Sequence, residues 1–481
     1  MTPVGDATTP TDLVAAVGPG KTVLDDGELA TLTTATAALL RAGGDSAREE
    51  YTRFLDTSYR GIAIDEDGLA NLHRGATVLV TGGTGCIGSA LLRQLMTFSP
   101  ARVVSISRGV EARWPLSDGV EYRQLDIRNG PALTELVREL RPDVVYHLAA
   151  QHDPGLAERE LHRTLSTNVT GTANVIAACR SVPGVRLACA STGKALRPFT
   201  RDIYAASKKM TEWLLAETAV DPAMTVSAVR FTHVVDNSII LQRLHEWSDT
   251  AQPVRLHSVD TMFYVQSARE AAQLLMSSVL ETRRQRFSLA TIRDLGWPVS
   301  LLELALGVLA STGSRSPLYV CGFEDGYEKA PYPGLYDPLV SGAVSPLFNS
   351  LEAFEAEPAR ACADLDVHRP STPSSTRVGA IIRQLCRAAA AGSSVDQLRS
   401  AVEACGWAMW EDTVASTPLP VRQRHAVLVA GTPDAAFSDD DQRVRAAVER
   451  SLHRPSRSRS SRIPALARAS TLDRLALGAP A

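Results

Sequence analysis

The chain of 481 residues is 44% hydrophobic and 21% charged, as in folded globular proteins, and its net charge of −3 gives no electrostatic reason to expect a nucleic-acid partner. Its seven cysteines are scattered, with no CxxC pair and no Cys/His cluster, which predicts reduced thiols, a cytoplasmic location and no metal site. Neither a signal-peptide pattern nor an apolar stretch of the roughly 20 residues needed to span a bilayer is present, so we expect a soluble protein without a membrane partner.

Residues 1–75 are expected to form a helical N-terminal extension, because apolar residues recur at helical spacing between Leu29 and Leu40. From 76 to 235, short apolar strands alternate with amphipathic helices. This alternation predicts an α/β fold with a doubly wound parallel sheet of the Rossmann type, covered by helices on both faces. The expected strands are 76–82, 102–108, 143–150, 185–192 and 224–231.

After about residue 235 the alternation becomes irregular, and we expect a smaller substrate-binding lobe over 236–350. Helices are predicted at 268–280 and 301–309, a strand at 317–323, and a loop from about 325. A mostly helical region should follow over 351–452. The tail, 453–481, is basic, rich in serine and low in complexity, so we expect it to be disordered.

A glycine motif, TGGTGCIG, follows the first expected strand and opens a helix. Glycine at such positions allows a tight turn, close approach of the backbone to a pyrophosphate, and close packing of helix on strand. The strand before the motif and the helix after it predict a dinucleotide site. The residues expected to line it here are Gly82, Gly85, Cys86, Ile87 and Gly88.

The end of the second strand bears on the choice of cofactor. An NAD enzyme usually places there a carboxylate that binds the ribose hydroxyls. This chain has Ser107 and Arg108 instead, and the first acid is Glu111. Because Arg108 can pair with a 2′-phosphate, we expect NADP rather than NAD. The alternative is a solvated surface arginine.

Two further segments are expected beside the cofactor. Asp126 and Ile127 follow another short strand, where a carboxylate suits the adenine amino group; a turn or cap residue is the alternative. Leu148, Ala149 and Ala150 end the next strand and suit close approach to the cofactor.

Tyr204 and Lys208 lie four residues apart on a predicted helix and therefore share a face. A lysine beside a tyrosine favours the phenolate and lowers its pKa, which gives a base that works near neutral pH. Ser191 and Thr192 close the fourth strand about twelve residues upstream, where a hydroxyl can bind the same substrate oxygen. We expect Thr192, Tyr204 and Lys208 to be catalytic.

These motifs support a resemblance over residues 78–280. The segments VLVTGGTGCIGSALLRQL, VVYHLAAQHDPGLAE, TNVTGTANVIAAC and YAASKK resemble the extended short-chain dehydrogenase/reductases. More narrowly, they are similar to the CapD-like polysaccharide-biosynthesis proteins, which include UDP-N-acetylglucosamine 4,6-dehydratases. The resemblance implies NADP, a nucleoside-diphosphate sugar linked to UDP, and a homo-oligomer. Dimers of such enzymes commonly form through two long helices, which correspond to 167–180 and 204–217 here.

In that family a Thr-Asp-Lys string supplies the acid and base that remove water from the sugar. Here the string is Thr192, Gly193 and Lys194. Lys194 can still be the base, but Gly193 offers no acid, and general acid catalysis is worth about 10²–10⁴-fold. Asp202 is a candidate substitute because of its proximity to Tyr204.

Other departures from the family pattern lie on the substrate side. His152 and Asp153 replace a Lys-His pair, and Thr232 and His233 replace a glycine and an asparagine. His233 is either a ligand or proton donor for the substrate, or a structural histidine. His152, Asn168, Thr232 and His233 are the candidate substrate residues.

Three functions remain open from the sequence. The first is a 4,6-dehydratase with a relocated acid. The second is an epimerase or oxidoreductase that forms a 4-keto sugar and reduces it again without losing water. The third is a catalytically weak binding or scaffold protein that retains a nucleotide fold.

Overall fold

The computed structural model describes residues 9, 11, 15, 17–21, 23–109, 112–296, 298–323, 345–370, 376–431 and 438–453. Glu111, most of the expected loop after 325, and the tail beyond His453 lie outside the described residues. The chain divides into two compact units. One comprises Met1–Arg60, His233–Ser267 and Leu295–Pro331, and the other Gly61–Thr232, Ala268–Asp294 and Tyr332–Ala481.

The larger unit is built on a nine-stranded sheet in the order β14-β15-β11-β6-β5-β4-β1-β2-β3. Neighbouring strands from β3 to β11 are parallel, whereas β15 and β14 are antiparallel. The strands are β1 (Thr77–Thr81), β2 (Arg102–Ser107), β3 (Val120–Gln124), β4 (Val144–His147), β5 (Arg186–Thr192), β6 (Thr225–Phe231), β11 (Phe287–Ile292), β14 (Glu357–Pro358) and β15 (Leu365–His368). The predicted doubly wound parallel sheet is confirmed.

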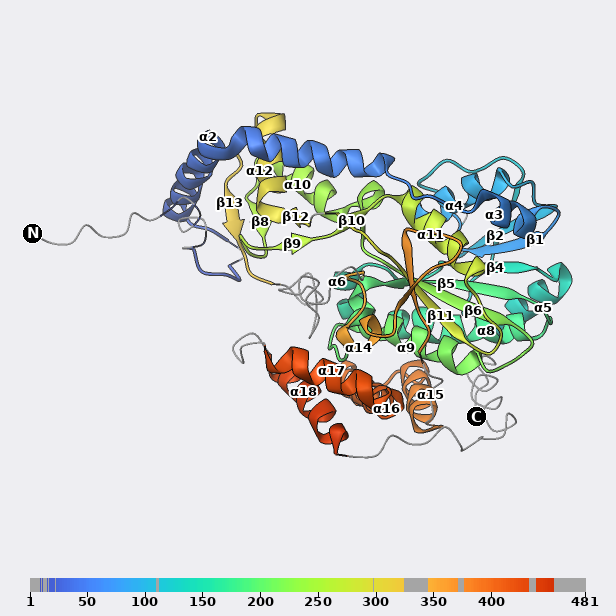
Figure 1. Cartoon of the computed structure of the whole chain (residues 1–481). Coiled ribbons are helices and arrows are strands. Elements are labelled where there is room, and N and C mark those ends of the chain that lie inside the picture. Colours follow the sequence, from blue (N-terminus) through green and yellow to red (C-terminus); the bar gives the residue numbers. More distant parts are fainter. Residues whose placement is uncertain are drawn as a thin grey trace, which may run out of the picture. The chain divides into compact units, whose positions relative to one another are not determined.

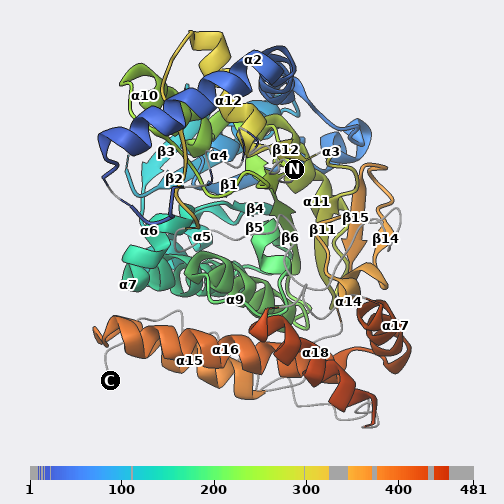
Figure 2. The same ribbon diagram turned by 90° about the vertical axis from the view of Figure 1, so that its left-hand side faces the viewer.

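The central strands are apolar on both faces because helices cover both faces of the sheet. Residues 78–81 of β1, for example, are all buried. Helices α3, α4 and α11 pack together on one face, and α5, α8 and α9 on the other (Figures 1 and 2). These helices are α3 (Glu66–His73), α4 (Cys86–Met96), α5 (Gly130–Leu140), α8 (Gly171–Arg180), α9 (Ile203–Thr218) and α11 (Ala268–Leu280).

Shorter helical segments connect the strands to these helices at the carboxyl edge of the sheet. The long helix expected from Asn168 begins instead as a π-helical turn, η2, directly before α8. The short segments are α6 (Pro154–Arg159), α7 (Leu161–Leu165), η2 (Ser166–Thr170), η3 (Gly193–Leu196) and α14 (Ser350–Ala353).

The C-terminal part of this unit is helical, as expected. Helices α15 and α16 form a hairpin that packs on α7, η2 and α9, and α17 and α18 pack beside it (Figure 2). The hairpin belongs to the same hydrophobic core as α8 and α9. The four helices are α15 (Thr376–Ala390), α16 (Val395–Ser416), α17 (Leu419–Ala430) and α18 (Asp439–Leu452).

The smaller unit has a separate hydrophobic core. Its long helix α2 (Asp26–Asp56) begins with a capping box between Asp25 and Glu28 and packs along α12 (Leu301–Thr312). The two backbones approach closely at Gly307, where an added Cβ would lie 2.2 Å from the carbonyl oxygen of Ala47. Its other elements are η1 (Thr57–Tyr59), β7 (His233–Val234), η4 (Val235–Asn237), α10 (Ile239–Asp249), β8 (Val254–Leu256), β9 (Met262–Phe263), β10 (Val265–Gln266), β12 (Val299–Ser300) and β13 (Leu318–Val320).

Within the described ranges, no helix combines the length and the apolar character needed to cross a membrane.

Candidate functional site

The glycine motif forms a tight turn between β1 and α4. Gly82 has a φ of +78°, and an added Cβ there would lie 2.7 Å from the Ala149 amide nitrogen. At Gly88 an added Cβ would lie 2.3 Å from the Gly82 carbonyl oxygen, and at Gly83 2.2 Å from the Ser105 hydroxyl. Side chains are therefore excluded from three positions of the turn.

Helix α4 begins at Cys86 with Gly85 as its N-cap, and no side chain caps it. The N-terminus of a helix directs backbone N–H groups and a partial positive charge outward, which suits a phosphate group. The bare turn and this uncapped N-terminus, to which Cys86 and Ile87 belong, fit the pyrophosphate of a dinucleotide.

The residues expected beside the adenosine half of the dinucleotide differ in exposure and in their contacts. Arg108 is exposed directly after β2, while the Ser107 hydroxyl donates to the Gly109 carbonyl at 2.9 Å. Asp126 forms a close ion pair with Arg128 at 2.6 Å, and this pairing lowers the pKa of its carboxyl. Ile127 is buried in the core. Arg108 is thus accessible, whereas Asp126 is already engaged by Arg128.

The carboxyl ends of β1, β4 and β5 are adjacent because these strands are neighbours in the parallel sheet. Thr81 joins two of them: its carbonyl accepts from the Leu148 amide at 3.0 Å and its hydroxyl from the Ala149 amide at 3.2 Å. Leu148, Ala149 and Ala150 therefore lie beside the glycine turn, at the edge where ligands bind in doubly wound sheets.

Thr192, Tyr204 and Lys208 meet at the same edge. Thr192 ends β5 and caps η3, and its nearby side chain acts to lower the pKa of the Tyr204 hydroxyl. Lys208 is one helical turn after Tyr204 on α9, and its Nζ donates to the Ala190 carbonyl at 2.9 Å. The structure brings the three residues of the predicted constellation together.

Burial sets the pKa values of this group. It lowers the pKa of Lys208 to about 8 and raises that of Tyr204 to about 12. The Tyr-x-x-x-Lys spacing predicts that Lys208 lowers the pKa of Tyr204. The direction here is the opposite, because the loss of solvent around the phenol outweighs the lowering effect of Thr192.

Lys194 and Asp202, expected as base and substitute acid, are paired with each other. Lys194 Nζ lies 2.9 Å from Asp202 Oδ2. The second Asp202 oxygen accepts from the Ala205 amide at 2.9 Å and so caps helix α9. Both carboxylate oxygens of Asp202 are therefore already engaged within the protein.

Gly193 faces an apolar neighbour. An added Cβ at this position would lie 2.8 Å from Leu347 Cδ2. Leu347 therefore fills the space next to Gly193 where an acidic side chain would begin.

The candidate substrate residues fall in different environments. The side chain of His152 is exposed, yet the protein around it lowers its pKa, as does the charge of Lys208. Asn168 is buried, and its amide is hydrogen-bonded to both backbone groups of Gln151 and to the Ser207 hydroxyl. It connects the loop after β4 to α9.

Thr232 ends the larger unit's central segment, and His233 begins the next segment of the smaller unit. His233 Nε2 is 2.8 Å from the Ser238 hydroxyl, and its ring packs against Phe54 and Phe263. Burial lowers its pKa to about 4, so the ring is neutral at pH 7 and poorly suited to donate a proton.

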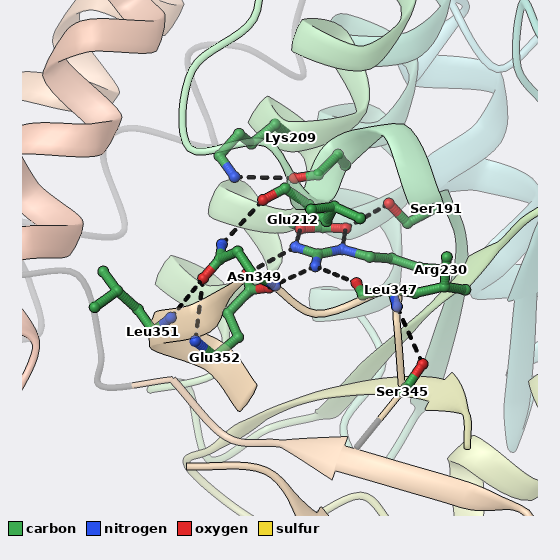
Figure 3. A network of polar contacts seen from close by, with 11 residues as sticks. Ser191, Lys209, Glu212, Arg230, Ser345, Leu347, Asn349, Leu351 and Glu352 are labelled. Carbon is green, nitrogen blue, oxygen red and sulfur yellow. Dashed lines mark hydrogen bonds and ion pairs between the residues drawn. The ribbon is translucent and has the colours of Figure 1, made fainter. Parts of the chain in front are cut away.

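A buried charge network is centred on Arg230 and includes Glu212, one helical turn after Lys208 on α9 (Figure 3). Arg230 pairs with Glu212 of α9 at 2.8 Å and with Glu352 of α14 at 2.6 Å, and it donates to the Leu347 carbonyl at 2.9 Å. Glu212 also accepts from the Ser191 hydroxyl at 2.6 Å. This network fixes Leu347 and the end of β5, and thereby holds the residues next to Gly193 and Thr192 in place.

Sequence reasoning did not identify Leu347, Glu352 or Glu158, whose carboxylate accepts from the Ile203 amide at 2.8 Å. These residues are far along the chain from the residues they contact, and no motif indicated them. Arg230 and Glu212 lie within recognised elements, but nothing in the spacing of a strand arginine and a helix glutamate predicts a pair.

The chain is similar in sequence to curated proteins of polysaccharide biosynthesis. The chain is 26% identical over 252 residues to the capsular polysaccharide biosynthesis protein CapD of Staphylococcus aureus, covering 50% of this chain and 41% of that protein. It is 28% identical over 149 residues to a UDP-N-acetylglucosamine 4,6-dehydratase (inverting) of Campylobacter jejuni, covering 30% of this chain and 43% of that protein. The alignments thus span less than half the length of these relatives.

The fold is similar to that in the X-ray structure of Pen from Bacillus thuringiensis, with a TM-score of 0.52 and 20% identity over 63% of this chain and 90% of that one. The model of the family described as "Polysaccharide biosynthesis protein" matches residues 78–328. This match covers more than half of the 481 residues. The chain therefore belongs to the polysaccharide biosynthesis protein family.

Proposed function

We propose that the protein is an NADP-dependent enzyme that oxidises a nucleotide-activated sugar, linked to UDP, at C4. The observation that carries this proposal is that Thr192, at the end of β5, and Tyr204 and Lys208, on the first turns of α9, lie at the edge of the sheet that also holds the glycine turn. Relatives named as nucleotide-sugar dehydratases support the substrate class. Arg108, exposed at the end of β2, supports NADP, with NAD as the alternative.

The residues of the chain have separate roles in this reaction. Tyr204 takes the proton of the sugar 4-hydroxyl, Thr192 donates a hydrogen bond to the same oxygen, and Lys208 supplies a nearby positive charge when protonated. A bound nicotinamide cofactor would supply the acceptor and later the donor of hydride. Burial raises the pKa of Tyr204 to about 12 in the free protein, so Tyr204 must lose its own proton before it acts as this base. The proton that it then takes from the sugar is the one that it returns to the ketone oxygen.

The surroundings of Gly193 favour a reaction that ends without loss of water, as in an epimerase or oxidoreductase. Leu347 fills the space beside Gly193, and both carboxylate oxygens of Asp202 are already bound, one by Lys194 and the other by the Ala205 amide. A 4,6-dehydration, with Lys194 as the group that moves the proton, is the second function that we consider.

The test is mass spectrometry of UDP-N-acetylglucosamine after incubation with the full chain and NADP, with NAD in a parallel reaction. We expect an altered sugar isomer of unchanged mass, and turnover about 10²-fold or more slower with Tyr204→Phe. Tyr59→Phe is the matched control, because the Tyr59 side chain is 81% exposed and lies outside the site. Loss of one water would instead establish the dehydratase. If the Tyr204→Phe chain replaced the wild-type chain in the cell without loss of biological activity, the result would support the alternative of a catalytically weak binding or scaffold protein.

A further inference from the structure

Segment 199–203 joins the turn that carries Lys194 to helix α9, and the C-terminal helices hold it from outside. The Phe199 ring stacks on Trp407 of α16, with 4.1 Å between ring centroids and 14° between planes. Gly406 allows this approach, since an added Cβ there would lie 3.1 Å from the Phe199 ring. Two residues later, Arg201 pairs with Glu403 of α16 and, at 2.8 Å, with Asp440 of α18.

The third contact is a buried bridge at the end of the segment. Glu158 of α6 accepts from the Ile203 amide at 2.8 Å through one carboxylate oxygen. Its other oxygen accepts from Arg399 of α16 at 2.6 Å, and its backbone carbonyl accepts from the same guanidinium at 3.2 Å. The Glu158 side chain is only 6% exposed, whereas Arg399 is 37% exposed, so the carboxylate end of these charge-assisted hydrogen bonds is shielded from solvent and the guanidinium end is partly open to it.

Ile203 is the first residue of α9, and Tyr204 follows it. The first N–H groups of a helix have no partner within the helix. In α9 the Ile203 amide depends on Glu158, which in turn depends on Arg399 for its countercharge. The connection therefore runs from the C-terminal hairpin to the residue next to Tyr204.

We propose that helix α16 is a built-in clamp on the catalytic helix, and that Arg399 is a positioning residue. Through Glu158 it fixes the first turn of α9, and with it the distance between the Tyr204 hydroxyl and Thr192. Phe199 and Arg201 hold the preceding residues against the same helix. The proposal rests on the proposed function in that Tyr204 performs the proton transfer.

The test compares Arg399→Ala and Arg399→Lys in the full chain with Arg377→Ala. Arg377 is a matched control because it lies on the same hairpin, and its pair with Glu411 is 3.5 Å long with side chains 71% and 62% exposed. Hydrogen exchange of peptide 199–205 is measured first. We expect about tenfold faster exchange in Arg399→Ala, a smaller change in Arg399→Lys, and none in Arg377→Ala. Equal exchange of this peptide in Arg399→Ala and Arg377→Ala overturns the proposal. Where Arg399→Ala does not fold, the exchange of Arg399→Lys is compared with that of Arg377→Ala instead.

Turnover of UDP-N-acetylglucosamine with NADP is the second measurement. We expect kcat to fall about tenfold or more in Arg399→Ala with little change in KM, because the geometry of Tyr204 changes while the sugar contacts remain. Arg399→Lys should recover part of kcat. Faster exchange with an unchanged kcat overturns the positioning role. Absence of turnover in the wild-type chain is a failure of the proposed function, and the exchange measurement then decides whether the clamp exists.

Discussion

Gly193 shows how one residue restricts the chemistry of the site. Its position directly follows Thr192, and an added Cβ would lie 2.8 Å from Leu347 Cδ2. The Leu347 carbonyl is bound by the buried Arg230, so the Leu347 side chain, rather than its backbone, is the part that must shift. Replacing the glycine therefore requires either displacement of Leu347 or movement of η3.

We expect Gly193→Asp to destabilise the protein by about 2–4 kcal/mol without introducing water loss, because it overpacks the site and places a carboxylate against an apolar side chain. Urea unfolding of the variant measures the change. The double variant Gly193→Asp/Leu347→Ala removes the obstructing side chain and should regain part of the stability relative to the single Leu347→Ala variant. A stable Gly193→Asp protein that releases water from the sugar would contradict this account.

At the scale of elements, Arg230 joins β6 to α9 and α14. It is fully buried and carries two carboxylate partners, Glu212 and Glu352. The positive charge lowers the pKa of the Glu352 carboxyl in spite of its burial. A complete buried network of this kind adds little to the free energy of unfolding, but removal of one partner lowers that free energy strongly.

Arg230→Met should lower the free energy of unfolding by about 3–5 kcal/mol, because it removes the cation with which both buried carboxylates pair. Arg377→Met, at the exposed pair with Glu411, should change it by less than about 0.5 kcal/mol. Chemical denaturation of both variants gives the comparison. A similar small effect for both substitutions would mean that the network is open to water.

These elements also show what could be predicted from the sequence. The strands, the glycine turn and the pair of Tyr204 with Lys208 were predictable because each depends on local spacing, which the chain carries within a few residues. Leu347 beside Gly193, Glu352 beside Arg230, and Arg399 beside Glu158 were not, since each joins segments more than a hundred residues apart. The direction of the Tyr204 pKa was also missed, because burial depends on the whole surrounding structure.

At the scale of the molecule, several buried histidines link stability to pH. Burial lowers the pKa of His147 to about 3 and those of His233, His368 and His425 to about 4. The unfolded chain binds their protons near the ordinary value of about 6.5. The unfolded state thus binds more protons below that pH, so this stability is present above 6.5 and is lost as the pH falls toward 4.

Thermal and urea unfolding at pH 7.5 and pH 5 should therefore show lower stability at the acidic pH. His233→Phe, which retains a ring against Phe54 and Phe263, should reduce the difference between the two pH values by about 1–2 kcal/mol. His453→Gln is the control, because His453 is exposed at the end of α18. If the stability difference between pH 7.5 and pH 5 were the same in His233→Phe and His453→Gln, His233 would not contribute to the pH dependence.

The C-terminal hairpin also bears on assembly. The resemblance to the extended short-chain dehydrogenase/reductases implies dimers through the helices at 167–180 and 204–217. In this chain α15 contacts η2, α16 contacts α9, and both share one hydrophobic core with α8 and α9. The apolar surface that a second copy would need on α9 is therefore already covered by the chain's own helices.

We accordingly expect that α9 does not serve as a dimer interface, whether the chain of 51.6 kDa is a monomer or associates through another surface. Light scattering coupled to size-exclusion chromatography measures the mass, and hydrogen exchange at low and high protein concentration locates any interface. A dimer with concentration-dependent protection of 204–217 would contradict the expectation. It would require the hairpin to leave α9, and Phe199 and Arg201 would then lose their partners on α16, so the peptide 199–205 would exchange faster in the dimer than in the monomer.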